Sequence, residues 1–270
     1  MKTRAITGIF FVAVMLGSFF AGPVIYTLFY GLLSLLCLQE FYKLLKQSGQ
    51  QPNLATGLLN GLFIFAAFAG TFYLEANLSH KLLFILVPTL GSIFIQELYR
   101  TSPAPFTNIG YTFLGLIFTI IPFTFFHALA FISPAGFNAH FPMAFLLMLW
   151  ANDTGAYLTG RQFGRSKLFE RHSPKKTWEG FIGGILISAV VGYIIGIYFT
   201  ELPWRNWVSI AIIIGIVGTG GDLVESMFKR SINVKDSGGI LPGHGGLLDR
   251  FDGLLLAAPI VFTYLYFILH

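Results

Sequence analysis

The stretch 221–253 gathers residues that could do chemistry inside an otherwise apolar chain. Five of the twelve acidic residues lie in this stretch, namely Asp222, Glu225, Asp236, Asp249 and Asp252. Four basic residues accompany them: Lys229, Arg230, Lys235 and Arg250. Carboxylates are oxygen ligands for hard cations, and basic side chains bind phosphate groups. Because apolar runs flank the stretch on both sides, we expect a metal-assisted nucleotidyl-transfer site at a membrane boundary.

The spacing of the first polar residues predicts one face of a helix. Asp222, Glu225, Ser226 and Lys229 are three, four and seven positions apart, which places them on one helical stripe. A salt-bridged helix end would account for Glu225 and Lys229. It explains Asp222 poorly, because Asp222 lies deepest in the apolar run. The glycines before Asp222 allow another helix or a ligand to come close.

The loop that follows is rich in glycine, including Gly245 and Gly246. Glycines permit tight turns and leave backbone N–H groups able to meet anionic oxygens. The loop can bring Asp249 near Asp222, and facing carboxylates from two helices suit a hard cation such as Mg²⁺. For His244 the sequence leaves three roles open: phosphate binding, proton transfer or support of the loop.

A second polar group lies within a preceding apolar run, at Asn152 and Asp153. An ionised carboxylate inside a membrane is costly and usually faces a polar cavity or a partner. Asp153 is therefore either a functional group or half of an ion pair with a neighbouring helix. The clustering of Asn, Asp and Thr at 152–154 favours function.

A third group, Ser173-Pro-Lys175-Lys176-Thr177, looks like the start of a helix. Serine accepts hydrogen bonds from the first backbone N–H groups, and proline suits the first helical position. A helix N-terminus with two lysines and a threonine hydroxyl is well suited to phosphates. We expect Lys175 or Lys176 to contact a phosphate.

The elements that position these residues are expected to be membrane-spanning helices. The chain has 270 residues, of which 55% are hydrophobic and 11% charged, whereas soluble domains carry roughly 25% charged residues. Apolar runs of about 20 residues recur, which suits helices rather than a barrel. The single cysteine, Cys37, excludes a disulfide framework and a cysteine-based metal site.

The predicted fold class is an all-α, polytopic membrane protein with about nine spans. They lie at about 5–21, 23–42, 54–74, 82–99, 109–132, 141–160, 180–200, 206–230 and 251–269. The first run resembles a signal peptide, but Ala21-Gly22 is a poor cleavage site and further spans follow, so we expect it to be retained. We predict one membrane domain, 1–270, with a scaffold at 1–140 and a catalytic portion at 141–270.

The distribution of basic residues predicts the orientation. With a cytoplasmic N-terminus, 15 of the 17 Lys and Arg fall on the cytoplasmic side and only Lys81 and Arg205 on the other. Cytoplasmic loops of membrane proteins carry this excess. The charged loops 161–179 and 229–250 are therefore predicted to face the cytoplasm.

The run from Ser226 to Asp252 resembles the signature of the phosphatidate cytidylyltransferases, or CDP-diacylglycerol synthases. The matching residues are Ser226, Lys229-Arg230, Lys235-Asp236, Pro242, His244-Gly245-Gly246 and Asp249-Arg250-Phe251-Asp252. Asn152–Gly155 and Ser173–Gly180 are also similar to the family. Before about residue 150 only the multi-span character matches.

The resemblance implies the reaction CTP + phosphatidic acid → CDP-diacylglycerol + pyrophosphate, dependent on Mg²⁺, at the cytoplasmic face of the cell (inner) membrane. It implies that Asp222 and Asp249 bind the metals, and Glu225 and Asp252 are candidates for the same site. A second cation such as K⁺ and a homodimer are further family expectations. No nucleic acid is expected as a partner.

The remaining candidates fit the chemistry of such a transfer. Positive charge would come from Lys229, Arg230, Lys235 and Arg250, with His244 beside them. Substrate or phosphate contacts are expected at Asp153, Ser173, Lys175, Lys176, Thr177, Ser226, Gly245 and Gly246. The lipid phosphate is ionised near neutral pH, so no strong general base is needed.

Two other classes of protein compete with this interpretation. Intramembrane carboxylates and glycine-rich breaks also suit a transporter, but almost all the charge is predicted on one side of the membrane. A related CTP-using lipid enzyme, such as a CDP-archaeol synthase or a polyprenol kinase, would also use a metal ion bound by carboxylates. Its motif matches Ser226–Asp252 less well. A purely structural membrane protein would not explain the clustered charge.

Overall fold

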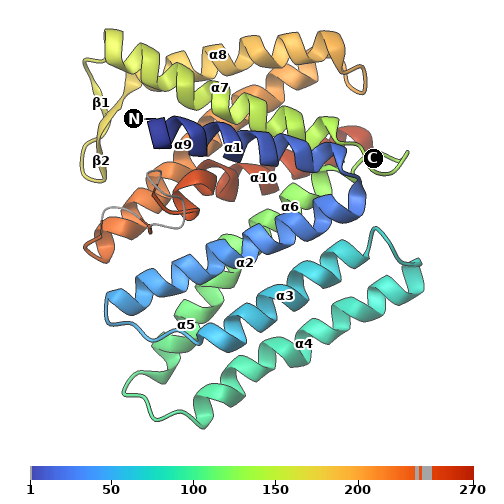
Figure 1. Cartoon of the computed structure of the whole chain (residues 1–270), viewed down its shortest axis with the longest axis vertical. Helices are drawn as coiled ribbons and strands as arrows, with labels where there is room; N and C mark the ends of the chain where they lie inside the picture. Colours follow the sequence, from blue (N-terminus) through green and yellow to red (C-terminus); the bar gives the residue numbers. More distant parts are fainter. Residues whose placement is uncertain (1, 235–236, 239–244) are drawn as a thin grey trace. The chain divides into compact units, whose positions relative to one another are not determined.

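The structure is a computed structural model that describes residues 2–234, 237–238 and 245–270. Its described residues are mainly helical, with one pair of short strands (Figure 1). They form two compact units, which we describe separately. Unit 1 comprises Met1–Ala128 and Ile232–Asp249, and unit 2 comprises Leu129–Ser231 and Arg250–His270.

Unit 1 is built from the N-terminal helices. They are α1 (Lys2–Phe20), α2 (Pro23–Gln47), α3 (Leu54–Gly70), α4 (Ala76–Leu98), α5 (Pro105–Gly115), the π-helical turn η1 (Leu116–Ile120) and α6 (Ile121–Leu129), whose last residue belongs to unit 2. The last three run on as one helical rod, since η1 is a single-turn π-bulge within a helix. The predicted span at about 109–132 corresponds to this rod.

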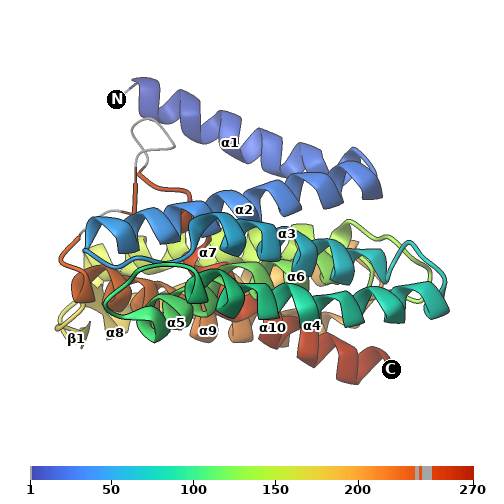
Figure 2. The ribbon, with the colours of Figure 1, turned by 90° about the horizontal axis from the view of Figure 1, so that it is seen from below.

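Helix α2 is the centre of unit 1. It packs against α1, α3, α5 and η1, and α1 and α2 form a hairpin (Figure 2). The buried rings of Tyr26 and Tyr30 lie 4.7 Å apart, and the Tyr42 hydroxyl donates to the Thr112 carbonyl over 2.6 Å. At Gly57 a Cβ would come within 2.5 Å of the Tyr42 ring, so the absence of a side chain there lets the helices approach.

Unit 2 is built from the C-terminal elements. They are α7 (His140–Phe163), the strands β1 (Lys167–Phe169) and β2 (Ser173–Thr177), α8 (Trp178–Tyr198), α9 (Trp204–Ser231) and α10 (Leu248–Leu269), whose first two residues belong to unit 1. Helices α7, α8 and α9 pack against one another (Figure 1). The buried Ser188 of α8 ties this layer together by donating to the Met148 carbonyl of α7 over 2.9 Å.

Small residues bring α9 and α10 together within unit 2. A Cβ at Gly253 would lie 3.5 Å from the Gly218 carbonyl oxygen, and one at Gly221 would overlap the Asp252 carbonyl oxygen. Two backbones can approach this closely only where side chains are absent. The crossing therefore places the end of α9 that bears Asp222 directly against residues 252–253 of α10.

The membrane class is confirmed by the length and composition of the helices. Within the described part of the chain, six helical segments are long and apolar enough to cross a membrane: Pro23–Gln47, Lys81–Leu98, Pro105–Leu129, Trp178–Tyr198, Trp204–Ser231 and Leu248–Leu269. Two shorter apolar helices cover Phe10–Phe20 and Leu54–Gly70. The count of nine spans and the functional division at residue 140 stay predictions.

The prediction of a helix start at Ser173 is wrong. Ser173–Thr177 is a strand that pairs antiparallel with Lys167–Phe169, and α8 begins only at Trp178. Proline is tolerated in such a two-stranded edge. The cap is Thr177, whose hydroxyl oxygen accepts from the Gly180 backbone N–H over 3.2 Å, so the N-terminus of the helix lies four residues later than predicted.

Candidate functional site

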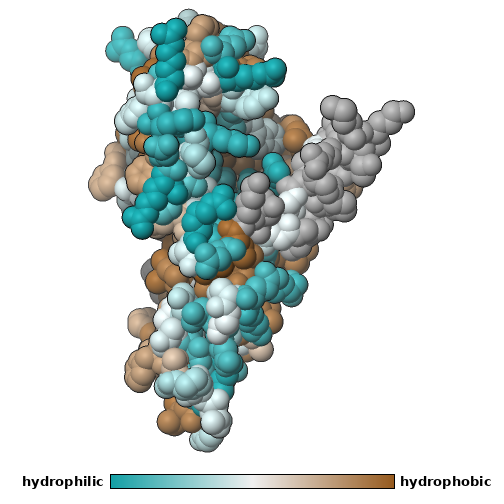
Figure 3. All heavy atoms as spheres, turned by 90° about the vertical axis from the view of Figure 1, so that its left-hand side faces the viewer, coloured by the Kyte–Doolittle hydropathy of each residue, from teal (hydrophilic) through white to brown (hydrophobic). Residues whose placement is uncertain are grey.

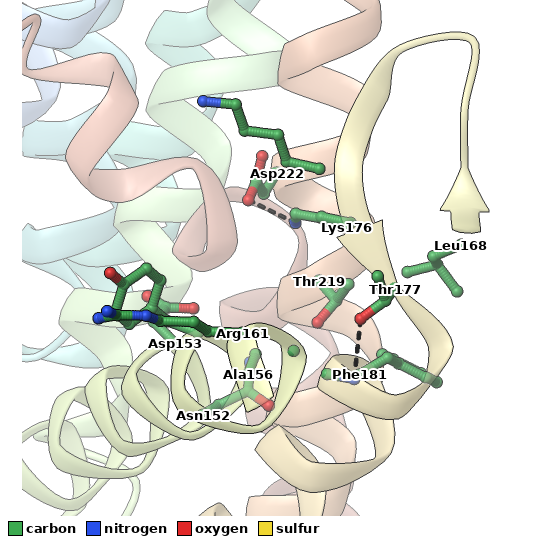
Figure 4. A pocket seen from close by; sticks show the side chains of 14 residues that line it. Asn152, Asp153, Ala156, Arg161, Leu168, Lys176, Thr177, Phe181, Thr219 and Asp222 are labelled. Atoms are coloured by element: carbon green, nitrogen blue, oxygen red, sulfur yellow. Dashed lines mark hydrogen bonds and ion pairs between the residues drawn. The ribbon is translucent and has the colours of Figure 1, made fainter. Parts of the chain in front are cut away.

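A cavity of about 390 Å³ opens in unit 2 where α7, β2, α8 and α9 meet. Its wall combines polar and apolar side chains (Figure 4). The lining residues are Asn152, Asp153, Ala156, Tyr157, Gly160, Arg161, Leu168, Lys175, Lys176, Thr177, Gly180, Phe181, Thr219 and Asp222. This volume is typical of small-molecule sites, which hold about 300–1,000 Å³.

An ion pair between Lys176 and Asp222 crosses the cavity wall. The Lys176 ammonium contacts the Asp222 Oδ2 atom, and Figure 4 shows the two side chains pointing toward each other. Their side chains remain 26% and 35% exposed. The Ser226 hydroxyl, one turn further along α9, donates to the other carboxylate oxygen of Asp222 over 3.3 Å. The pair is thus held in place but open to an incoming ligand.

The N-terminus of α8 supplies a second feature of the wall. Thr177 caps this helix and lines the cavity together with Lys175 and Lys176. The Glu179 carboxylate accepts the backbone N–H groups of Arg165 and Ser166 over 3.1 Å each, which ties the β1–β2 hairpin to the helix. A helix N-terminus flanked by two lysines is a favourable place for a phosphate group.

The α7 side of the cavity carries Asn152 and Asp153. Asn152 is only 2% exposed, and its Oδ1 atom has no hydrogen-bond partner among the described residues. Asp153 lies within electrostatic range of both Asp222 and Lys176. The structure therefore brings together members of the three groups that the sequence singled out in separate segments of the chain.

Further carboxylates lie next to this wall. The Asp252 carboxylate of α10 is within electrostatic range of those of Asp222, Glu225 and Asp153. Glu225 is fully buried and forms an ion pair with Lys229 over 2.6 Å. These groups are all oxygen donors, so their chemistry fits a hard cation such as Mg²⁺. In the described part of the chain, however, no three His, Cys, Asp or Glu side chains are already grouped closely enough to hold one.

Hydrophilic side chains gather at this end of unit 2. In Figure 3 they cover the upper part of the visible face, where Figure 1 places the β1–β2 hairpin. The exposed cations of the segment are Arg161, Arg165, Lys167, Arg171 and Lys175. Such a surface favours anionic ligands.

Comparison with known proteins agrees with this chemistry. The model of the cytidylyltransferase family matches residues 2–268. The chain belongs to this family. Three similar proteins are each named phosphatidate cytidylyltransferase. The protein of Staphylococcus haemolyticus (strain JCSC1435) is 34% identical to this chain over 264 residues. The proteins of Staphylococcus aureus (strain COL) and Staphylococcus epidermidis (strain RP62A) are 32% identical over 266 residues and 33% identical over 264 residues. Each match covers 97% of this chain and 97% of the relative.

Membership of the cytidylyltransferase family confirms the resemblance and makes the chain a nucleotidyltransferase. The match extends beyond the predicted region. The sequence motifs covered only about 150–253, whereas the family model begins at residue 2. The N-terminal helices are therefore part of the family's fold.

Several predicted site residues are not among the residues that line the cavity of unit 2. Asp249, Gly245 and Gly246 belong to unit 1, and the approach of Asp249 to Asp222 stays a prediction. Lys235 and His244 lie outside the described residues. The predicted site residues of unit 2 that do not line the cavity are Ser173, Glu225, Ser226, Lys229, Arg230, Arg250 and Asp252.

Sequence reasoning missed three polar residues of the cytidylyltransferase cavity. Thr219 lies one turn before Asp222, so helical spacing alone could have placed it on the same face. Tyr157 likewise lies one turn after Asp153. Arg161 enters the sequence analysis only as part of the charged loop 161–179, but it lines the cavity as well.

Proposed function

We propose that this cytidylyltransferase transfers the cytidylyl group of CTP to phosphatidic acid, giving CDP-diacylglycerol and pyrophosphate. The observation that carries the proposal is the Lys176–Asp222 pair at the wall of a cavity beside the N-terminus of α8. That arrangement offers cations and backbone N–H groups to a triphosphate, next to carboxylates that suit a metal ion. The names of the relatives supply the acceptor.

In the proposed reaction an ionised oxygen of the lipid phosphate attacks the α-phosphorus of CTP. The bond between the α-phosphorus and the bridging oxygen breaks, and its electron pair leaves with pyrophosphate. The nucleophile is already charged near neutral pH, so no side chain needs to remove a proton. What the protein must supply is in-line positioning and neutralisation of charge on the phosphates.

Lys176 is proposed as the main phosphate ligand of the chain. Its ammonium group is partly exposed and can exchange the Asp222 carboxylate for a phosphate oxygen. Lys175 and Arg161 line the same cavity and add positive charge. The Thr177 cap fixes the direction of the first N–H groups of α8. Such donors act most strongly where water is partly excluded.

We propose Mg²⁺ as the cofactor, held by Asp222 with Asp252 and Asp249. When bound, it would neutralise charge on the α-phosphate and the departing pyrophosphate. The support for Asp252 is its electrostatic proximity to Asp222 and Asp153, and the support for Asp249 is its place in the family motif. Glu225 is already paired with Lys229 and would act mainly by orienting that lysine. A second cation such as K⁺ is proposed from the family resemblance.

We further propose that the cavity faces the cytoplasm, that the enzyme resides in the cell membrane and that it forms a homodimer. The 15 to 2 distribution of Lys and Arg supports the orientation. CTP would then arrive from the aqueous side. Phosphatidic acid would reach the same end of the helices from within the bilayer.

The test is turnover by the purified protein in detergent, with labelled CTP, phosphatidic acid and Mg²⁺. We expect CDP-diacylglycerol and pyrophosphate in equal amounts. Asp222→Ala and Asp249→Ala should each lower turnover by at least about 10²-fold, while circular dichroism and thermal unfolding show that both stay folded. Mg²⁺ binding, measured by calorimetry without lipid, should weaken in both variants.

Three results would contradict the proposal. Active variants would refute the metal assignment. Transfer of the γ-phosphate of CTP to a polyprenol, with release of CDP, would favour a lipid kinase. Wild-type protein that turns over no lipid phosphate but moves a solute into vesicles would be a transporter.

A further inference from the structure

A buried carboxylate in unit 1 has no place in the chemistry described so far. Glu40 lies in the apolar helix α2 and is only 2% exposed. Burying a carboxylate is costly unless charged or polar groups compensate it. Its Oε2 atom accepts the backbone N–H of Leu248 over 2.7 Å, from a residue 208 positions further along the chain. Helix α2 therefore reaches the first residue of α10.

The contact helps to cap the N-terminus of α10. The first N–H groups of a helix have no partners within the helix and need other acceptors. Leu248 donates to Glu40, and Asp249 donates to the Ser237 hydroxyl over 3.3 Å. A carboxylate at this position also interacts favourably with the helix dipole.

Two glycines let the loop before α10 lie directly on Glu40. A Cβ at Gly246 would lie 2.5 Å from the Glu40 Oε1 atom, and one at Gly238 would overlap the same oxygen. Gly245 adopts a φ of 86°, a left-handed conformation that favours glycine. The close approach of this carboxylate thus explains why Gly238 and Gly246 have no side chain.

The same loop holds the side chain of Asp249. The Asp249 Oδ2 atom accepts the backbone N–H groups of Ser237 and Gly246, each over 3.1 Å. Glu40 holds Leu248, the residue immediately before Asp249, and packs against Gly246. These two N–H contacts fix the direction of the Asp249 carboxylate relative to the loop.

We propose that Glu40 is a positioning residue of the transferase: it clamps the start of α10 and so fixes the Asp249 carboxylate in the direction required for Mg²⁺ binding. This proposal rests on the proposed role of Asp249. It assigns a function to a helix that the sequence placed in the scaffold. Groups that orient metal ligands typically change metal affinity or activity by 10–100-fold when removed.

The test compares Glu40→Ala, Glu40→Gln and a matched control, Glu97→Ala. Glu97 is also a buried carboxylate of unit 1, 2% exposed, but it accepts from Asn108 over 2.6 Å and pairs with Arg100. In Glu40→Gln the amide oxygen can still accept from Leu248. The new NH₂ group replaces Oε1, which has no partner among the described residues.

The first readout needs neither CTP nor lipid. Hydrogen exchange at the amides of residues 246–249 should be at least about tenfold faster in Glu40→Ala, close to wild type in Glu40→Gln and unchanged in Glu97→Ala. Gly246→Ala, whose Cβ would overlap the Ser237 hydroxyl oxygen and lie 2.5 Å from the Glu40 Oε1 atom, should also accelerate exchange at these amides and serves as the second variant if Glu40→Ala does not fold. Unchanged exchange in Glu40→Ala, or equal acceleration in Glu97→Ala, would refute the proposal that Glu40 holds the start of α10.

The second readout concerns the metal. Mg²⁺ affinity in calorimetry without lipid should fall about tenfold in Glu40→Ala. The kcat should fall by a similar factor while the KM for CTP changes little, because the proposed CTP contacts at Lys176 and Thr177 are untouched. Faster exchange with unchanged Mg²⁺ affinity would refute the positioning role. If Glu40→Ala shows faster exchange and weaker Mg²⁺ binding but the wild-type protein turns over no phosphatidic acid, the positioning role of Glu40 is supported. The proposed function is then refuted.

Discussion

The two ends of unit 2 both pair an acidic with a basic side chain, but in different surroundings. At the start of α8, Lys176 and Asp222 line the cavity. Beyond the other end of α8, Glu201 contacts the His140 imidazole and accepts from the Asn138 amide over 2.9 Å. Since α8 has 21 residues, the two pairs lie on the order of 30 Å apart along it.

The difference lies in what holds each basic group. The His140 ring is stacked on Phe199, with centroids 4.0 Å apart and planes at 8°. Lys176 ends in a flexible ammonium group beside open space, and it can move to another anion without breaking a stacked contact. An ion pair in a cavity can therefore serve a ligand, whereas a pair built into a turn serves stability.

The largest effect that would test this comparison is expected from Lys176→Met. Removing a cation that stabilises charge in the transition state should lower kcat/KM for CTP by about 10²–10³-fold. The matched control is Lys167→Met on β1, which removes the same charge from an exposed residue that does not line the cavity. Steady-state turnover of labelled CTP measures both.

The control decides between a specific contact and general electrostatics. Lys167→Met should retain turnover within about twofold, because exposed charges are screened by salt. An equal loss in both variants would mean that the hairpin acts only through its summed charge. In that case the two ends of unit 2 would not differ in the way proposed.

An intermediate effect is expected where α9 crosses α10, beside Asp222. A Cβ at Gly221 would overlap the Asp252 carbonyl oxygen and lie 3.3 Å from the Gly253 Cα atom. Gly221→Ala should therefore destabilise the protein by about 1–3 kcal/mol, seen as a lower thermal midpoint in detergent. The neighbouring Gly220 has nothing within 4 Å of its Cβ position.

Gly220→Ala is the control for helix propensity. Alanine in an open helical position should raise stability by up to about 1 kcal/mol. The two adjacent substitutions are thus expected to have opposite signs. If Gly221→Ala is also stabilising, the two helices do not cross at this glycine, and the support for an Asp252 contribution to the site falls.

The sequence predicted features that depend on local patterns. The helical stripe of Asp222 and Ser226 is confirmed by their hydrogen bond over 3.3 Å, and that of Glu225 and Lys229 by their ion pair. Such i,i+4 contacts follow from the helical repeat alone. Apolar runs likewise predicted the membrane class, because span length is set by bilayer thickness.

Features that depend on distant contacts were not predicted. Ser173 has every local signal of a helix start, yet pairing with Lys167–Phe169 makes it part of a strand. Glu40 is a lone carboxylate in an apolar span, which is itself a signal of function. Its partner Leu248 lies 208 residues away, and no spacing rule connects the two.

The smallest effect is expected at the Glu201 end. Burial tends to raise the pKa of Glu201, but hydrogen bonds from Asn138, its own backbone and His140 outweigh burial and hold it below its ordinary value of 4.5. A carboxyl group with a lowered pKa adds stability above its unfolded pKa, and this stability is lost as the pH falls through the folded value. Because Glu201 is partly exposed, the contribution should be less than about 1 kcal/mol.

Thermal unfolding of wild type and Glu201→Gln across a pH series measures this contribution. The wild-type protein should be slightly more stable at pH 7, and the difference should shrink as the pH falls below about 4.5. Turnover at pH 7 should be unchanged, since the turn is separated from the cavity by the length of α8. A difference that grows toward low pH, or a loss of turnover comparable to that of Lys176→Met, would show that both ends of unit 2 serve the reaction.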